Sequence, residues 1–136
     1  MTRKVFYLGY APPPVYEMLR RLAPAEFELV TLDEDTDIQR KARIADCEAV
    51  VMARPLARDV LDAAVRLRVV QHQGVGYQDM VDMGALRARG LPLALMPEGT
   101  TIPVAEHVVM LIIAVHRKLA FADSELRRGR WHVNAL

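Results

Sequence analysis

Short apolar runs rich in β-branched residues alternate along the chain with stretches of helical spacing. In the helical stretches, apolar side chains recur every three or four positions. This alternation predicts right-handed βαβ units, a parallel sheet and helices on both of its faces. Gly90 stands where the last of these helices is expected to stop. The predicted strands are 5–10, 27–32, 49–54, 67–73 and 91–96, and the predicted helices are 15–23, 38–45, 58–65 and 79–89.

The tail of the chain has a different pattern. From Ile102 to about Arg128 the spacing predicts one long helix, with Thr101 as its cap and Gly129 at its end. The first half of this helix is apolar almost all round, so other parts of the protein must cover it. We therefore expect the helix to leave the compact body or to pack on another chain. We also expect a further part of the protein beyond Leu136.

Composition and charge narrow the class of protein. The chain has 136 residues, of which 52% are hydrophobic and 26% charged, and its formal net charge is +1. These values are typical of one globular domain, and the charge balance gives no electrostatic footprint for nucleic acid or an anionic membrane. The longest apolar run, 108–115, is far shorter than the ~20 residues of a membrane-spanning helix. Cys47 is the single cysteine, which favours a reducing, cytoplasmic setting.

The segment VVQHQGVGYQDM, residues 69–80, contains the main candidate for a binding site. One interpretation is a dinucleotide loop, although Asp79 stands at the sixth position of the fingerprint, where its carboxylate would repel phosphates. A second is a tight turn in which the glycines supply positive φ and Asp79 caps the next helix. A third is a carboxylate site, because consecutive amides at the carboxyl end of a parallel strand can bind a small anion. His72, beside the loop, is expected to be open enough to line a cleft.

A resemblance favours the third interpretation. The segment QGVGYQDMVDMGALRARGLPLALMPEGTTIPVAEHVVMLIIAVHRKL strongly resembles the D-isomer-specific 2-hydroxyacid dehydrogenases, the family that includes formate, glycerate and phosphoglycerate dehydrogenases. The segments ARPLARDVLDAA (53–64) and ELRRGRWH (125–132) also look like parts of that family. A single motif such as VAEH is moderately specific, whereas the ordered set is highly specific.

The resemblance implies the fold and its division into domains. It implies an α/β fold, namely a flavodoxin-like, doubly wound sheet of five parallel strands in the order 2-1-3-4-5, plus a long C-terminal connecting helix. Residues 1–101 are then the substrate domain, and residues 102–136 are the long interdomain helix and the start of a hinge. The family's NAD-binding domain begins shortly after this point, so we expect it to be absent from this chain.

The resemblance also implies which residues meet the ligands. The amides of Val75 and Gly76 match those that bind the substrate carboxylate in the family, and Val75 also lies near the nicotinamide end of the cofactor. Arg54 ends the third strand, where a guanidinium could bind the same carboxylate; a surface salt bridge is the alternative. Thr100 is expected to hold substrate and Thr101 to contact the cofactor, with helix capping as the alternative for both. The family's catalytic Arg, Glu and His lie beyond this chain, so no catalytic or metal-binding residue is assigned here.

The resemblance finally implies a function. The chain is expected to be the substrate-binding half of an NAD(P)-dependent D-2-hydroxyacid dehydrogenase, which exchanges hydride between nicotinamide and a 2-hydroxy acid, a 2-keto acid or a formate-like carboxylate. NAD or NADP belongs to the complete enzyme, and we expect none bound to this chain, which alone should be inactive. The expected partners are a small carboxylate, the missing NAD-binding domain or a partner chain, and further copies in a homo-oligomer, with no nucleic acid and no membrane. The alternative is a non-catalytic, stand-alone binding or interaction module that retains the sheet.

Overall fold

The computed structural model describes residues 2–131, so the hinge expected after the long helix lies outside the described residues. The chain divides into two compact units, Met1–Met96 and Pro97–Leu136. The first unit holds the sheet and the second holds the helical tail.

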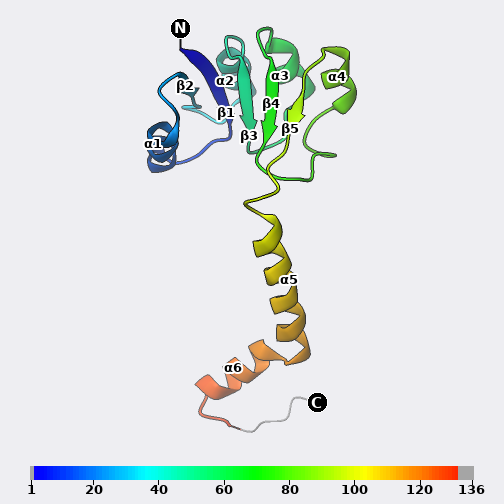
Figure 1. The fold of residues 1–136 in the computed structure, drawn as a ribbon. Helices are drawn as coiled ribbons and strands as arrows, with labels where there is room; N and C mark the ends of the chain where they lie inside the picture. Colours follow the sequence, from blue (N-terminus) through cyan, green and yellow to red (C-terminus); the bar gives the residue numbers. More distant parts are fainter. Residues whose placement is uncertain (1, 132–136) are drawn as a thin grey trace. The chain divides into compact units, whose positions relative to one another are not determined.

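The first unit is built on a parallel sheet with strands in the order β2-β1-β3-β4-β5 (Figure 1). This order confirms the predicted flavodoxin-like topology. In the centre of the sheet, Met52 of β3 lies opposite Leu8 of β1 on one side and His72 of β4 on the other. The strands are β1 (Arg3–Leu8), β2 (Phe27–Val30), β3 (Ala49–Met52), β4 (Val69–His72) and β5 (Leu93–Ala94).

Helices connect the strands of this unit, and the last of them starts later than predicted. It begins at Met83 rather than at residue 79, because the preceding residues pair with the loop after β3. There the Leu56 amide donates to the Met80 carbonyl at 2.8 Å, and Leu56 forms a parallel bridge with Val81. Gly90 ends the helix with a φ of 64°, as predicted. The helices are α1 (Pro13–Leu22), α2 (Asp37–Ile44), α3 (Arg58–Ala63) and α4 (Met83–Ala88).

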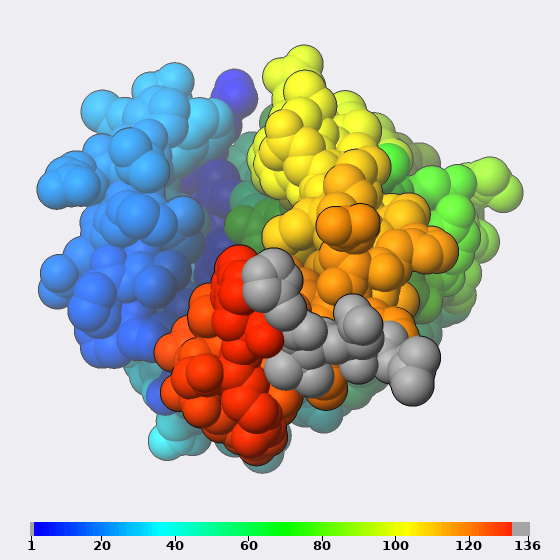
Figure 2. All heavy atoms as spheres, turned by 90° about the horizontal axis from the view of Figure 1, so that it is seen from below, coloured from blue at the N-terminus to red at the C-terminus, as the bar shows by residue number. Residues whose placement is uncertain are grey.

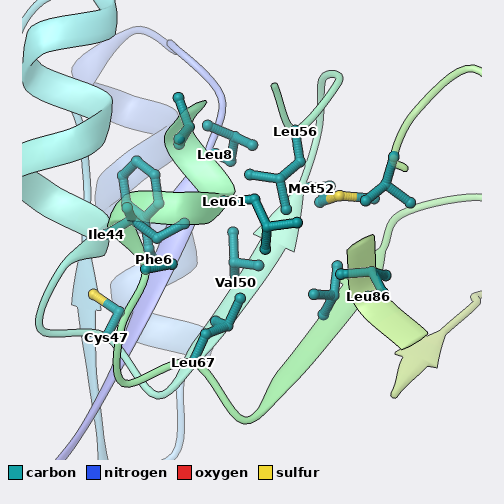
Figure 3. Packing of buried hydrophobic residues seen from close by; sticks show 14 of the residues in the cluster. Phe6, Leu8, Ile44, Cys47, Val50, Met52, Leu56, Leu61, Leu67 and Leu86 are labelled. Carbon is teal, nitrogen blue, oxygen red and sulfur yellow. The ribbon is translucent and has the colours of Figure 1, made fainter. Parts of the chain in front are cut away.

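The hydrophobic core lies on one face of the sheet (Figure 3). Side chains alternate between the two faces of a strand, so Phe6, Val50 and Val70 of three adjacent strands point to the same side, and all three are fully buried. Each such side chain contributes about 1.5–3 kcal/mol by leaving water. The helices contribute Ile44, Val60, Leu61, Ala85 and Leu86 to the same cluster.

The opposite face of the sheet is less completely covered. Val5, Ala49 and Val69 alternate with the core residues and are each half-buried. Together with Phe27 and Leu29 they line an apolar hollow of about 500 Å³. Parallel sheets are usually covered on both faces. This face can therefore accept further cover.

The second unit contains two helices, α5 (Thr101–His116) and α6 (Leu119–Arg127), instead of the single long helix that was predicted. The break lies at Lys118, which adopts the left-handed conformation with a φ of 51° and donates its amide to the Val115 carbonyl at 3.0 Å. This left-handed residue ends α5 as a glycine would. Because no glycine or proline marks the position, the pattern gave no sign of the break. Gly129, with a φ of 73°, follows α6 as predicted.

Within the described part of the chain, the apolar side chains of α5 are exposed. No residue of this helix is buried, and its atoms, yellow to orange, are visible at the surface in the space-filling view (Figure 2). Val108 is 49% exposed and Ile113 is 57% exposed. Over the described residues, the helices are too short or too polar to cross a membrane.

Cys47 supplies a test of the packing beside α2. It is fully buried, and this burial is the main cause that raises the pKa of its thiol to about 11. Since the thiolate is the reactive form, we expect Cys47 to resist alkylation by iodoacetamide at pH 8 in the native chain and to react readily in denaturant. Mass spectrometry after a timed exposure measures both rates. Rapid alkylation without denaturant would show that this part of the core is open.

Candidate carboxylate site at the sheet edge

The loops after β1, β3 and β4 meet at one edge of the sheet, because these strands are adjacent and parallel. A Cβ at Gly9 would lie 2.9 Å from the Cβ of Ala53, so only glycine permits the close approach of the first two loops. The buried Tyr16 hydroxyl donates to the Gly9 carbonyl at 2.8 Å and accepts from the Ala11 amide at 3.0 Å. Tyr16 therefore fixes the loop after β1, and the Ala53 amide joins the two loops by donating to the Leu8 carbonyl at 3.1 Å.

Two backbone hydrogen bonds, one from Gln73 and one to Gly74, fix the start of the glycine loop. The Gln73 amide donates to the Met52 carbonyl of β3 at 3.2 Å. The Met96 amide, beyond β5, donates to the Gly74 carbonyl at 3.0 Å. These backbone bonds fix the point at which the loop leaves the sheet.

Val75 and Gly76 form the exposed part of this loop. Val75 is 46% exposed, and within residues 2–131 neither amide donates a hydrogen bond to another group. Gly76 is exposed, and a Cβ there would meet nothing closer than Oε1 of Gln78 at 4.0 Å. Neighbouring backbone N–H groups without internal acceptors can bind one carboxylate.

The structure corrects two details of the other interpretations. Among the described glycines, positive φ occurs at Gly90 and Gly129, so neither Gly74 nor Gly76 supplies it. The next helix begins only at Met83, whereas a pyrophosphate site needs a helix amino terminus directly behind its glycines. The loop therefore lacks the geometry of a dinucleotide site.

His72 lies beneath the loop and does not line a cleft. It is only 8% exposed, and its Nδ1 is buried without a hydrogen-bond partner among the described residues. A Cβ at Gly74 would lie 3.1 Å from the His72 Nε2. The prediction of an open His72 is wrong, because the imidazole packs under the loop. A side chain at position 74 would therefore require the His72 ring to shift by a few tenths of an ångström.

Arg54 follows β3 at the same edge and forms an ion pair. Its Nη1 donates to Oδ1 of Asp35, and the same oxygen accepts from Arg40. The hydrogen bond from Arg54 is the largest cause that holds the pKa of Asp35 below its ordinary value, followed by the bond from Arg40. Sequence reasoning missed Asp35, because it lies 19 positions from Arg54 and no local pattern joins them.

Thr100 and Thr101 belong to the second unit, whereas Arg54 and the glycine loop belong to the first. Thr100 precedes α5 and its side chain makes no capping hydrogen bond. The Thr101 hydroxyl donates to the Pro97 carbonyl at 2.7 Å. The prediction of Thr101 as the cap is wrong, because this residue is already helical and its side chain donates to a carbonyl instead of accepting from an amide. The ligand roles of both residues stay predictions.

The cap of α4 is Asp82, and the prediction of Asp79 is wrong. Oδ1 of Asp82 accepts from the Ala85 amide at 3.0 Å, and this bond is the main cause that lowers the pKa of the Asp82 carboxyl. Asp79 is exposed in the segment that turns back toward Leu56 before the helix begins.

The chemistry available at this edge is the binding of an anion. The loop offers backbone N–H donors, and Arg54 adds a guanidinium whose planar nitrogens match a carboxylate. Over residues 2–131, the His, Cys, Asp and Glu side chains do not gather in groups of three or more that could hold a metal ion.

The sheet and its edge define an α/β domain of the doubly wound class, in which ligands bind beyond the carboxyl ends of the strands. A family model described as the D-isomer specific 2-hydroxyacid dehydrogenase, catalytic domain, matches residues 9–130. The chain belongs to this family, which confirms the resemblance seen in the sequence.

Named relatives are considerably longer than this chain. Glyoxylate reductase of Thermococcus kodakarensis is 32% identical over 136 residues, which cover 96% of this chain and 39% of that protein. D-3-phosphoglycerate dehydrogenase of Archaeoglobus fulgidus is 36% identical over 86 residues, which cover 62% of this chain and 16% of that protein. The NADPH-dependent glyoxylate/hydroxypyruvate reductase of Sinorhizobium meliloti, solved with NADP and malonate, matches with a TM-score of 0.77 at 28% identity over 96% of this chain and 40% of its own. The chain thus spans about two fifths of these full-length reductases.

The two glycines of the loop give a matched pair of substitutions. We expect Gly74→Ala to lower the free energy of unfolding by about 1 kcal/mol, because the added Cβ crowds the buried His72 ring. Gly76→Ala should leave it unchanged or raise it by up to about 0.5 kcal/mol, because that Cβ enters open space. Urea unfolding followed by circular dichroism measures both. Equal effects of the two substitutions would contradict the packing described for His72.

The cap of α4 gives a second matched pair. Asp82→Ala should lower the melting temperature at pH 7 by a few degrees, because the Ala85 amide loses its acceptor. Asp79→Ala should leave it nearly unchanged. The folded-state pKa of Asp82 lies below its ordinary value of 3.8, so its contribution is complete above pH 3.8 and is lost as the pH falls through the lower, folded-state pKa. The difference in melting temperature between wild type and Asp82→Ala should therefore narrow as the pH falls below 3.8, and a difference that stays constant from pH 7 to pH 2 would argue against this cap.

Proposed function

We propose that this chain is the substrate-binding half of an NAD(P)-dependent D-2-hydroxyacid dehydrogenase and binds a small 2-hydroxy or 2-keto acid, or a formate-like carboxylate. One observation carries the proposal. Val75 and Gly76 are exposed residues whose amides have no acceptor within the described chain, on a loop whose base is fixed by backbone hydrogen bonds. Family membership agrees with this use of the loop.

The residues of this chain would bind and orient the substrate. The Val75 and Gly76 amides would donate to its carboxylate, and the Arg54 guanidinium would bind the same group from the neighbouring loop. Thr100 is a further candidate for contact with the substrate, as the resemblance implies. Fixing the carboxylate limits the orientations available to the adjacent C2 carbon, and orientation of this kind accounts for much of the rate of an enzyme reaction.

A nicotinamide cofactor, when bound, supplies the hydride chemistry. The described residues do not fit its pyrophosphate, because α4 begins well after the glycine loop. We propose that, in a complete enzyme, Val75 lies near the nicotinamide end of NAD or NADP and Thr101 contacts the cofactor, and that the chain alone binds neither cofactor. No step of proton transfer is assigned to the residues of this chain.

The organisation of the protein is also part of the proposal. We propose that residues 1–101 are the substrate domain and that residues 102–136 begin the connection to an NAD-binding domain, in the same protein or in a partner chain. One face of the sheet is only half-covered, and the apolar side chains of α5 are exposed. Both observations support the proposal that a further domain, or another copy in a homo-oligomer, packs on these surfaces. The buried thiol of Cys47 agrees with a cytoplasmic setting, and we propose neither nucleic acid nor a membrane as a partner.

The binding proposal can be tested by titration. We expect glyoxylate, added to the ¹⁵N-labelled 136-residue chain, to shift the amide resonances of residues 74–77 with a dissociation constant in the millimolar range, since a few exposed hydrogen bonds to one carboxylate give weak binding. Glycolamide, which lacks the carboxylate, serves as the control and should produce no such shift. Shifts confined to other loops would contradict the proposed site.

The same preparation tests the assignment of chemistry. With glyoxylate and NADH or NADPH, absorbance at the nicotinamide band should stay constant, because the chain lacks the family's acid-base His and the arginine that polarises the substrate carbonyl. Oxidation of either cofactor above the buffer rate would show that this chain holds catalytic groups of its own.

A further inference from the structure

Arg54, whose guanidinium binds the substrate in the proposed function, already forms an ion pair with Asp35. Nη1 of Arg54 contacts Oδ1 of Asp35, and among the described acidic residues Asp35 is its partner. Their side chains are 39% and 42% exposed, so a carboxylate from solution can reach both. A substrate arriving at Arg54 therefore meets a guanidinium that an internal carboxylate already neutralises.

The strand order places this contact on the side away from the glycine loop. Asp35 follows β2, whereas the loop follows β4, and β1 and β3 lie between those two strands. Arg54 itself follows β3, which lies next to β4 in the sheet. The contact with Asp35 thus draws the guanidinium toward β2, although β3 neighbours the strand that carries the glycine loop.

Arg40 holds Asp35 independently of Arg54. Its Nη2 contacts the same Oδ1 of Asp35, its Nη1 contacts Asp37, and its side chain is only 13% exposed. Asp35 therefore keeps a cationic partner when Arg54 leaves, so Arg54 is the exchangeable member of the group. Exposed ion pairs are weak, whereas a planar guanidinium can bind a carboxylate through two parallel bonds.

We propose that Asp35 competes with the carboxylate of the substrate for the Arg54 guanidinium and thereby weakens the binding of small carboxylates at the glycine loop. The inference rests on the proposed function, because it requires the carboxylate to bind beside Val75 and Gly76. Asp35 is then a residue that sets affinity, although it does not touch the substrate.

The test compares two neighbouring aspartates. Asp35→Asn removes the competing charge. Asp33→Asn is the matched control, because this substitution changes the net charge by the same amount, whereas Asp33 pairs with Arg43 and not with Arg54. Glyoxylate is titrated against each labelled 136-residue chain while the amides of residues 74–77 are followed. We expect Asp35→Asn to lower the dissociation constant about threefold relative to both wild type and Asp33→Asn, as suits an exposed ion pair. Asp35→Ser, which also lacks the charge, should give the same gain, and adding Arg54→Gln to Asp35→Asn should remove it.

The outcomes separate this inference from the proposed function. Equal affinities for Asp35→Asn and Asp33→Asn, or weaker binding by Asp35→Asn and Asp35→Ser in folded protein, would overturn the competition. Persistence of the gain in the double variant would overturn the role of Arg54. If residues 74–77 do not respond in any protein, wild type included, the proposed function itself fails and this inference fails with it. Melting curves recorded on the same samples establish that each variant is folded.

Discussion

The candidate site depends on the parallel pairing of β3 with β4. Because Met52 lies opposite His72, the hydrogen bond from the Gln73 amide to the Met52 carbonyl sets where β4 leaves the sheet. Because the two strands are parallel neighbours, Arg54 after β3 and the glycine loop after β4 lie at the same edge of the sheet. A shift by one residue would turn the side chains of β4 to the other face, taking Val70 out of the core and His72 from beneath Gly74. The hydrophobic cost of exposing Val70 therefore protects the geometry of the loop.

The sequence predicted those parts of the fold that local chemistry decides. Strand and helix periods gave the order of elements, and the glycines at positions 90 and 129 marked helix ends, since positive φ is easy for glycine alone. The strand order drew on the family resemblance as well as on this alternation. Lys118 shows the limit of such reasoning. A lysine in the left-handed conformation ends α5 where no residue type gives warning.

The errors at the site have a common cause, namely contacts between residues far apart in the sequence. The start of α4 moves to Met83 because Leu56, in another loop, pairs with the segment before it, and the cap passes from Asp79 to Asp82. His72 is buried because the loop that follows it folds back over its ring. A one-dimensional pattern records none of these long-range contacts. Val75 and Gly76 were found through the resemblance, and the structure adds that their amides have no internal acceptor within residues 2–131.

The two kinds of hydrogen-bond donor at this edge, the Arg54 guanidinium and the backbone amides of the glycine loop, differ in whether they already have a partner. The charge of Arg54 is balanced by Asp35, whereas the backbone amides of the loop have no internal acceptor within the described chain. Amide donors keep their direction as long as the sheet register holds, so under the proposed function they would specify where a carboxylate sits even when the arginine is engaged elsewhere. In water such contacts are weak, because solvent competes for every donor. A second body that covers this edge and excludes water would strengthen the same hydrogen bonds without changing a residue of this chain. Under the proposed function, one arrangement of donors would therefore give weak binding in the isolated chain and stronger binding in a complete enzyme.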